Sequence, residues 1–282
     1  MLGTKQKVFI ARLIQSVVMF VRRSFRLPPT DEFKRNGLLW RLDLREGIDF
    51  SIWLLGSFEP ETLRSYSRIV KAGDVVLDIG ANVGAHTLPL SRLVGDAGLV
   101  IAFEPTDYAF LKLQQNLSGN KNIVKRVRCL QVMLGDQSEG AHPPAALYSS
   151  WPLNMDKDLH PEHRGRLMTT NGAVATTLDA VLAELNLERL DCVKLDIDGF
   201  ECQMLRGAHS TLLKWHPTII MELAPYVLEE QGASIEELLE LLAKYGYSIF
   251  SLDGNSRLAA DPKKLRKLIP QGSSLNVVAK IE

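Results

Sequence analysis

A short apolar run that ends in an acid and a glycine-bracketed turn constrains this chain more than any other stretch. Residues 75–84 read VVLDIGANVG, in which β-branched residues predict a strand and Gly80 and Gly84 bracket a loop. Residues 86–93 then have helical spacing. A strand, a tight loop and a helix in this order bring unpaired helix amides and a close backbone approach to one place, where a ligand can bind.

A second acid follows at the end of the next predicted strand. Residues 99–103 are apolar and lead into Glu104, about twenty residues beyond the glycine loop. In a doubly wound sheet an acid at this position holds the hydroxyl pair of a ribose. The pattern therefore predicts a nucleoside ligand.

The loop itself indicates which nucleoside. A dinucleotide fingerprint has three glycines, whereas this loop has Gly80 and Gly84 around Asn82, with Asp78 directly before it. A carboxylate there would repel a pyrophosphate but would accept hydrogen bonds from an ammonium group, which S-adenosylmethionine carries. The alternative is that Asp78 caps the turn and the glycines only turn the chain.

Three motifs together carry a family resemblance. They are DIGANVG at 78–84, AFEP at 102–105 and KLDIDGFECQMLRGA at 194–208. The chain from about Leu38 to its end resembles the FkbM-type methyltransferases, which use S-adenosylmethionine. The resemblance implies an α/β class I methyltransferase fold, with a Rossmann-like, seven-stranded, mostly parallel sheet, helices on both faces and an antiparallel last strand. Asp198 stands where the family usually has a glutamate.

The resemblance also implies further residues at the cofactor. A G-x-[FY]-E element precedes the glycine loop in the family, which makes Phe58 and Glu59 candidates at the cofactor edge. Asp136 follows the predicted third strand, 127–134, and is the candidate for the adenine. The alternatives are an acid at a helix start for Glu59 and a plain turn residue for Asp136.

The predicted catalytic residues follow the fourth strand, residues 191–197. Ligands in open α/β sheets bind at the carboxyl ends of strands, where Asp196 is our candidate base and Lys194 would orient it or lower its pKa. Asp198 is a substrate candidate, as is Glu222 at the end of the strand predicted at 218–223. A less favoured alternative is that Asp196 and Glu222 bind a divalent cation, and another is that the acids cap helices.

Residues 140–172 form the least regular stretch, and we predict a substrate-side insertion there. His160, His163 and Trp151 would line a polar substrate pocket, with a histidine able to act as base near neutral pH. Zinc is not favoured, because no cysteine accompanies the histidines.

The first thirty residues differ from the rest. Residues 5–26 carry six Lys and Arg and no acid, and their apolar residues share one helical face. A basic amphipathic helix of this kind is typical of contact with an anionic membrane surface. A helix docked on the domain or on a second copy, and a targeting peptide, are the alternatives. No transmembrane helix is predicted, because the apolar run is too short.

Pro28 and Pro29 separate this segment from a methyltransferase domain over 31–282. Residues 38–70 are expected to form an N-terminal cover, with a hairpin that turns at Glu46 and Gly47.

Composition limits the remaining choices. The chain has 282 residues, 46% of them hydrophobic, which suits one α/β domain. Lys plus Arg and Asp plus Glu both number 33, so nucleic acid is not favoured as a partner. Three scattered cysteines favour buried thiols in a reducing compartment, and we expect a cytoplasmic protein, with the inner membrane face as the alternative place.

The leading hypothesis is an S-adenosylmethionine-dependent methyltransferase that modifies a hydroxyl of a sugar, a glycan or a small natural product. The oxygen and the glycan come from the resemblance alone. The alternatives are methylation of nitrogen on a sugar or peptide, and a nucleoside-binding module without turnover at a membrane surface. A homo-oligomer is left open.

Overall fold

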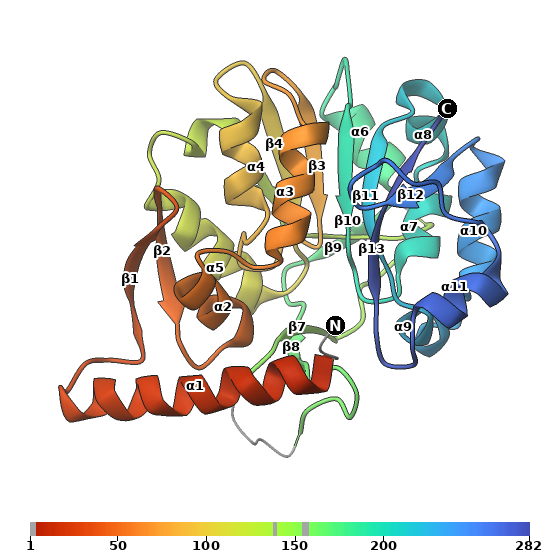
Figure 1. Cartoon of the computed structure of the whole chain (residues 1–282). Helices are drawn as coiled ribbons and strands as arrows, with labels where there is room; N and C mark the ends of the chain where they lie inside the picture. The colour runs from red at the N-terminus through yellow and green to blue at the C-terminus, as the bar shows by residue number, and fades with distance from the viewer. Residues whose placement is uncertain (1–3, 138–139, 154–157) are drawn as a thin grey trace.

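A seven-stranded sheet forms the centre of the computed structural model, which describes residues 4–137, 140–153 and 158–282 (Figure 1). The strand order is β12-β13-β11-β10-β3-β4-β5. Only β13 runs antiparallel to its neighbours, β11 and β12. The predicted mostly parallel sheet with an antiparallel last strand is confirmed. The strand bounds are β3 (Val75–Ile79), β4 (Leu99–Phe103), β5 (Val127–Leu130), β10 (Cys192–Leu195), β11 (Thr218–Leu223), β12 (Ser248–Ser251) and β13 (Leu275–Lys280).

Helices cover both faces of this sheet because successive strand residues point to opposite sides. Val76 packs with Tyr66 and Leu90 on one face, while Leu77 belongs to the apolar cluster of the other. The first face carries α3 (Pro60–Ile69), α4 (Thr87–Val94) and α5 (Asp107–Ser118). The second carries α6 (Leu178–Glu184), α7 (Glu201–Arg206), α8 (His209–Trp215), α9 (Pro225–Glu230), α10 (Ile235–Lys244) and α11 (Pro262–Leu268). The class I methyltransferase arrangement is therefore present.

The predicted hairpin at Glu46 and Gly47 is wrong. β2 (Leu38–Asp43) pairs with the preceding strand, β1 (Thr30–Arg35), and residues 47–55 form a helix, α2 (Gly47–Leu55). The other edge of β2 is occupied by two side-chain amides, because Asn116 of α5 and Asn120, two residues beyond the end of that helix, accept its backbone N–H groups. No second strand can pair there. Gly56, at φ +80°, ends α2 with a left-handed cap.

Two other expectations about strands need correction. The strand predicted at 127–134 is interrupted at Gln131, whose side-chain amide donates to three neighbours. Strand β5 therefore ends at Leu130. The next residues form β6 (Val132–Leu134), which pairs with β9 (Val174–Thr176) outside the main sheet. The insertion is more regular than its sequence suggests. It contains the antiparallel pair β7 (Ala146–Ser150) and β8 (Arg166–Thr169), which no short turn connects.

The predicted N-terminal helix is present as α1 (Thr4–Ser24), which lies along the lower edge of the molecule in Figure 1. Ala11, Val18 and Met19 pack against a cluster that includes Leu44 and Phe50 of the cover. No helix in the described part of the chain is long and apolar enough to span a bilayer.

Candidate active site

Neighbouring parallel strands place Lys194 beside Asp78. The two residues are register partners in the β10–β3 pair, so their side chains point the same way. The Lys194 ammonium is buried and lies 3.2 Å from Asp196 Oδ2 and 3.8 Å from Asp78 Oδ1, and it donates to the Gly80 carbonyl at 3.2 Å. These anionic partners raise its pKa against the effect of burial. One permanent cation therefore joins the glycine loop to the predicted base.

The two carboxylate oxygens of Asp78 differ in their hydrogen bonding. The side chain is fully buried, and Oδ2 accepts a hydrogen bond of 2.5 Å from the Thr87 hydroxyl. Oδ1 has no hydrogen-bond partner among the described residues. Burial raises the pKa of Asp78, and Lys194 opposes that shift. A buried acceptor without a donor is the group that an ammonium or a bound water would complete, so Asp78 fits the amino-acid end of S-adenosylmethionine.

The glycine loop is held in unusual backbone conformations. Gly80 has φ +82° and its N–H donates to the Phe103 carbonyl, while Asn82 has φ +47°. A Cβ on Gly84 would lie 2.7 Å from the Leu88 side chain. Packing within the protein therefore requires a glycine here, whether or not a ligand binds. Asn82 donates from its side chain to the Ser149 carbonyl of β7 at 3.0 Å. The loop thus contacts the insertion directly.

Glu104 joins the loop to the next strand tip. Its side chain is buried; Oε2 accepts the Asn82 N–H at 2.9 Å, and Oε1 accepts both the N–H and the hydroxyl of Thr106 at 2.9 and 2.6 Å. Burial raises the Glu104 pKa, and these donors oppose the shift. The Thr106 hydroxyl is in turn 2.6 Å from that of Ser149. Asp78 and Glu104 therefore lie at one edge of the sheet, on adjacent strands.

Four acids gather around the tip of β10, and we call them the carboxyl cluster: Glu59, Asp196, Asp198 and Glu222. Each of Glu59, Asp198 and Glu222 has a raised pKa, first through burial and then through the charge of Asp196 or its neighbours. The Asp196 side chain is 30% exposed. Three carboxyls with raised pKa values thus lie around the more accessible Asp196, which is paired with Lys194.

Glu59 is held by hydrogen bonds from residues of α3 and β13. It has φ +46°, and its Oε2 accepts from Thr62 and from Asn276 of β13 at 3.0 and 3.1 Å. The same oxygen lies 3.8 Å from Nε2 of His86, a buried ring whose edge meets Phe58. Phe58 and Glu59 thus contact His86, the residue directly before α4, and their predicted place at the cofactor edge stays a prediction.

The carboxylate of Asp136 is engaged elsewhere. It forms an ion pair with Arg206 of α7 at 3.1 Å, and both side chains are more than one third exposed. Among the described residues, no hydrogen bond or ion pair joins Asp136 to Asp78 or Glu104. Its assignment to the adenine stays a prediction.

The insertion histidines form a group of their own. The rings of His160 and His163 stack at 3.8 Å, the edge of Tyr148 meets both, and His160 Nε2 lies 3.3 Å from Glu230 of α9. Burial lowers the His163 pKa to about 4, so this ring is neutral at pH 7. Its Nδ1 accepts the Gly165 N–H, so the ring proton sits on Nε2. His163 is therefore suited to donate a hydrogen bond, not to act as the base that the sequence suggested.

His160, His163 and Glu230 are also the described side chains whose ligand atoms lie within 4.8 Å of one another, the spacing of a metal site. Nδ1 of each histidine accepts backbone N–H groups, which leaves the proton of each neutral ring on the Nε2 atom. A ligand to zinc must present a bare nitrogen. The arrangement therefore favours a hydrogen-bonded cluster, and the absence of zinc stays an expectation.

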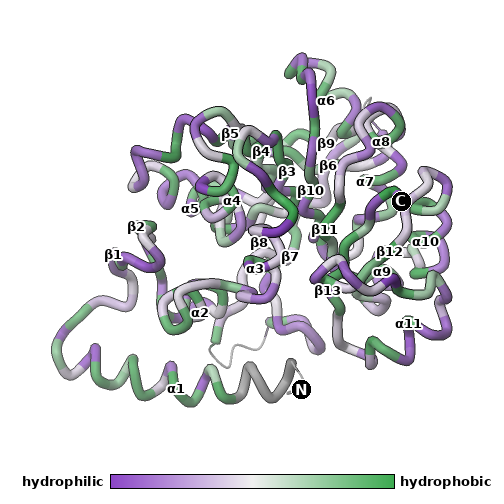
Figure 2. The backbone as a smooth tube through the Cα atoms, turned by 45° about the horizontal axis from the view of Figure 1, so that its top comes forward, coloured by the Kyte–Doolittle hydropathy of each residue, from purple (hydrophilic) through white to green (hydrophobic). Residues whose placement is uncertain are grey.

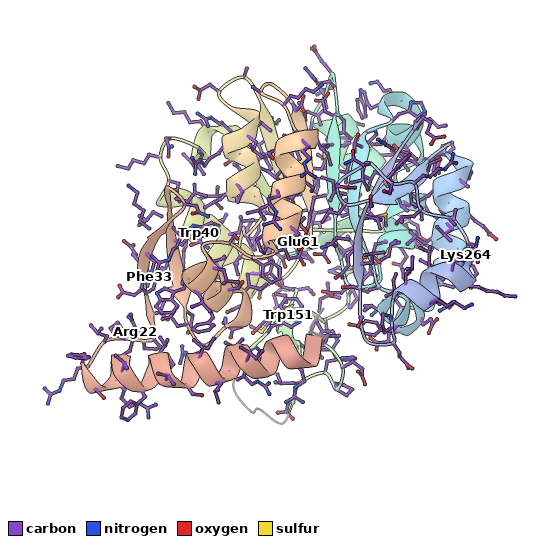
Figure 3. The ribbon with its side chains drawn as sticks, viewed as in Figure 1. Arg22, Phe33, Trp40, Glu61, Trp151 and Lys264 are labelled. Carbon is purple, nitrogen blue, oxygen red and sulfur yellow. The ribbon has the colours of Figure 1, made fainter. Side chains whose placement is uncertain are left out.

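The insertion and the carboxyl cluster meet at α9. The phenol of Tyr226 has its pKa raised by burial and by Glu222, Asp198 and Glu230, so it lies between the two groups. Trp151, half-buried and labelled in Figure 3, accepts the Gly47 N–H through its carbonyl. The predicted substrate residues are thus spread along one side of the site.

Several residues of the site were missed from the sequence. His86 and Thr87 directly follow the glycine loop, so their position was a usable signal. Ser149 and Asn276 gave none, because they reach the site from 43 residues beyond Thr106 and 217 residues beyond Glu59.

Comparisons with known proteins agree with this arrangement. The model of the Methyltransferase FkbM domain matches residues 78–249, more than half of the chain. Methyltransferase sdnD of Sordaria araneosa is 27% identical over 198 residues, which cover 57% of this chain and 73% of that protein. The 2-O-methyltransferase NoeI of Sinorhizobium fredii is 26% identical over 188 residues, 64% of this chain and 75% of that protein.

Among solved structures, methyltransferase FkbM of Methylobacillus flagellatus KT matches 77% of this chain and 50% of its own, at 15% identity and a TM-score of 0.43. The family match favours an enzyme over a nucleoside-binding module without turnover. With the motifs at 78–84, 102–105 and 194–208 placed at one edge of the sheet, this chain belongs to the FkbM family of S-adenosylmethionine-dependent methyltransferases.

Proposed function

We propose that this enzyme methylates a hydroxyl group of a sugar, a glycan or another polyol. S-adenosylmethionine, held by Asp78 at its ammonium and by Glu104 at its ribose, supplies the methyl group when bound. The observation that carries the proposal is the ion pair of Lys194 with a partly exposed Asp196, at the strand tip beside the unpartnered Asp78 oxygen.

Asp196 is the proposed base. A hydroxyl must lose its proton as its oxygen forms a bond to carbon, and a carboxylate within hydrogen-bond reach can take that proton. Lys194 holds Asp196 in place through their ion pair at 3.2 Å. Because Lys194 also binds the Gly80 carbonyl, the base is positioned relative to the cofactor loop.

The rest of the carboxyl cluster supports a polyol acceptor. Burial raises the pKa of Asp198 and of Glu222, and a carboxyl group accepts hydrogen bonds when ionised and can also donate one when protonated. Hydroxyl groups of sugars offer both functions. The relative named as a 2-O-methyltransferase also supports an oxygen acceptor.

The same cluster supports a second candidate, an amine of an amino sugar or a peptide. The carboxyl group of Asp196, whose side chain is 30% exposed, would attract a protonated amine and would then remove its proton. The two candidates differ in the atom that carries the new methyl group.

The test is product formation by the full chain with a panel of hexoses, amino sugars and oligosaccharides, with a ¹³C-methyl donor. We expect an O-methyl carbon resonance, and a rate lower by about 100-fold or more in Asp196→Asn. Glu240→Gln, an exposed acid of α10, is the matched control. An N-methyl resonance would select the second candidate, and an unchanged rate in Asp196→Asn with intact cofactor affinity would overturn Asp196 as base.

A further inference from the structure

Helix α1 presents an apolar face to solvent. Six of its larger apolar side chains are 37–72% exposed, and they recur at helical spacing on one side. Figure 3 shows side chains projecting from the outer side of α1, away from the rest of the molecule. The six residues are Ile10, Leu13, Ile14, Val17, Phe20 and Val21.

The opposite side of α1 is fixed to the domain. The Gln15 amide is buried and donates to the Leu44 carbonyl, and the Arg22 guanidinium donates to the Pro28 carbonyl and to Asp31. These contacts set the rotation of the helix about its axis, so the apolar face cannot turn inward without breaking them. Figure 2 shows apolar residues alternating with polar ones along α1.

The charge on this segment has one sign. No acid occurs before Asp31, and the exposed Arg23 and Arg26 follow the apolar face at the helix end. Burial, and then the charge of Arg164 in the insertion, lowers the pKa of Arg12, so Arg12 lies near that second cation. An anionic surface would relieve this concentration of positive charge, whereas a second copy of the same basic helix would add to it.

We propose that α1 lies in the plane of an anionic lipid surface, with Ile10, Val17 and Phe20 among the acyl chains and the arginines at the headgroups. A helix with a strong apolar face and basic flanks binds in this way. At 21 residues and without a spanning apolar run, α1 suits the interface and not the bilayer core.

This placement would turn the active site toward the membrane. The cluster beneath α1 includes Ala81 and Val83 of the glycine loop, and Arg12 neighbours the insertion, so α1 lies on the side where the strands end (Figure 1). If the proposed function holds, the acceptor is then a glycan or polyol carried at the membrane surface. Lipid binding itself needs no turnover, so its test is independent of that function.

The experiment is co-sedimentation of the full chain with vesicles of phosphatidylcholine alone or with phosphatidylglycerol, without cofactor. We expect binding only to the anionic vesicles, and a severalfold loss between about 0.1 and about 1 M NaCl, where the Debye length falls from ~10 to ~3 Å. Val17→Asp with Phe20→Asp should weaken binding about tenfold or more. Arg23→Gln and Arg26→Gln should each weaken it about fivefold.

Leu213→Asp, at an exposed leucine of α8, is the matched control and should bind as the unaltered chain does. Thermal unfolding and cofactor titration verify that each variant is folded. Equal binding to neutral vesicles, or no binding at all, would overturn the proposal. So would a concentration-dependent dimer that Phe20→Asp dissociates while lipid has no effect, because the occupant of the face would then be a second copy.

Discussion

A Cβ atom on Gly80 would stand 1.8 Å from the carbonyl oxygen of Asp196. The glycine loop and the strand that carries the proposed base therefore touch through their backbones, with no room for a side chain. Because backbone atoms cannot move aside as the end of a side chain can, this contact sets the distance between the cofactor loop and the base.

Gly80→Ala should lower the free energy of unfolding by about 3 kcal/mol or more, because it combines a left-handed φ with a backbone collision. Gly73→Ala is the control, since Gly73 has φ +90° but nothing within 4 Å of a Cβ; it should cost about 1 kcal/mol. Urea unfolding measures both. Equal losses would show that the contact with Asp196 carries no cost.

Glu104→Gln should weaken S-adenosylmethionine binding by about tenfold or more. The carboxylate accepts from Asn82 and twice from Thr106, and an amide must set its NH₂ against one of these donors. Calorimetric titration measures the affinity, with Glu240→Gln as reference. Unchanged affinity in a folded variant would remove Glu104 from the cofactor site.

Glu201 should make stability depend on pH. Its buried carboxyl accepts the N–H groups of Ile197 and Gly199, yet burial raises its pKa to about 7. The folded state thus binds this proton more tightly than the unfolded state does. The resulting contribution of Glu201 to the free energy of unfolding is therefore complete below about pH 4.5 and is lost as the pH rises to about 7.

The free energy of unfolding of Glu201→Gln, relative to that of the unaltered chain, should therefore rise between pH 4.5 and pH 8, by about 3 kcal/mol at most. Urea unfolding of both proteins measures this difference. A constant difference across this range would contradict the raised pKa.

Ser149→Ala should loosen the β7–β8 pair. The Thr106 hydroxyl already donates to Glu104, so Ser149 must be the donor in the 2.6 Å contact between the two hydroxyls. Its loss should cost about 1 kcal/mol and speed hydrogen exchange in β7. Ser150→Ala, which removes a bond to Glu46 of the cover, is the comparison and should leave cofactor affinity unchanged. Slow exchange in Ser149→Ala would argue against the contact.

Removal of divalent cations should leave the methylation rate within about twofold, because Lys194 already supplies the positive charge that Asp196 needs. The measurement is the rate after EDTA treatment, with and without added Mg²⁺. A loss that Mg²⁺ restores would instead give Asp196 and Glu222 the role of metal ligands.

The sheet could be predicted because its strands are short β-branched runs with acids at their ends, and β4 and β11 have the predicted bounds. The fold of the cover could not be predicted in the same way. Asn116 and Asn120, which lie far along the chain, occupy the edge of β2, and α2 stands where the hairpin was expected. Thr177 and Ser234 cap their helices as local patterns indicate.

The site divides in the same way. Asp78, Lys194 and Asp196 could be recognised because strand register brings them together. The contacts of Ser149 in β7 with Asn82 and Thr106 could not, because they depend on how the insertion folds back.

Strand β7 touches two places at once. Through Ser149 it meets Thr106 and Asn82, which both bind Glu104, and the same segment carries Tyr148, which packs on the histidines beside α9. Any acceptor that shifts the insertion would thus also change the position of Glu104. A nucleoside bound at Glu104 would in turn restrain the insertion. By reciprocity, donor and acceptor should strengthen or weaken each other's binding by one shared factor.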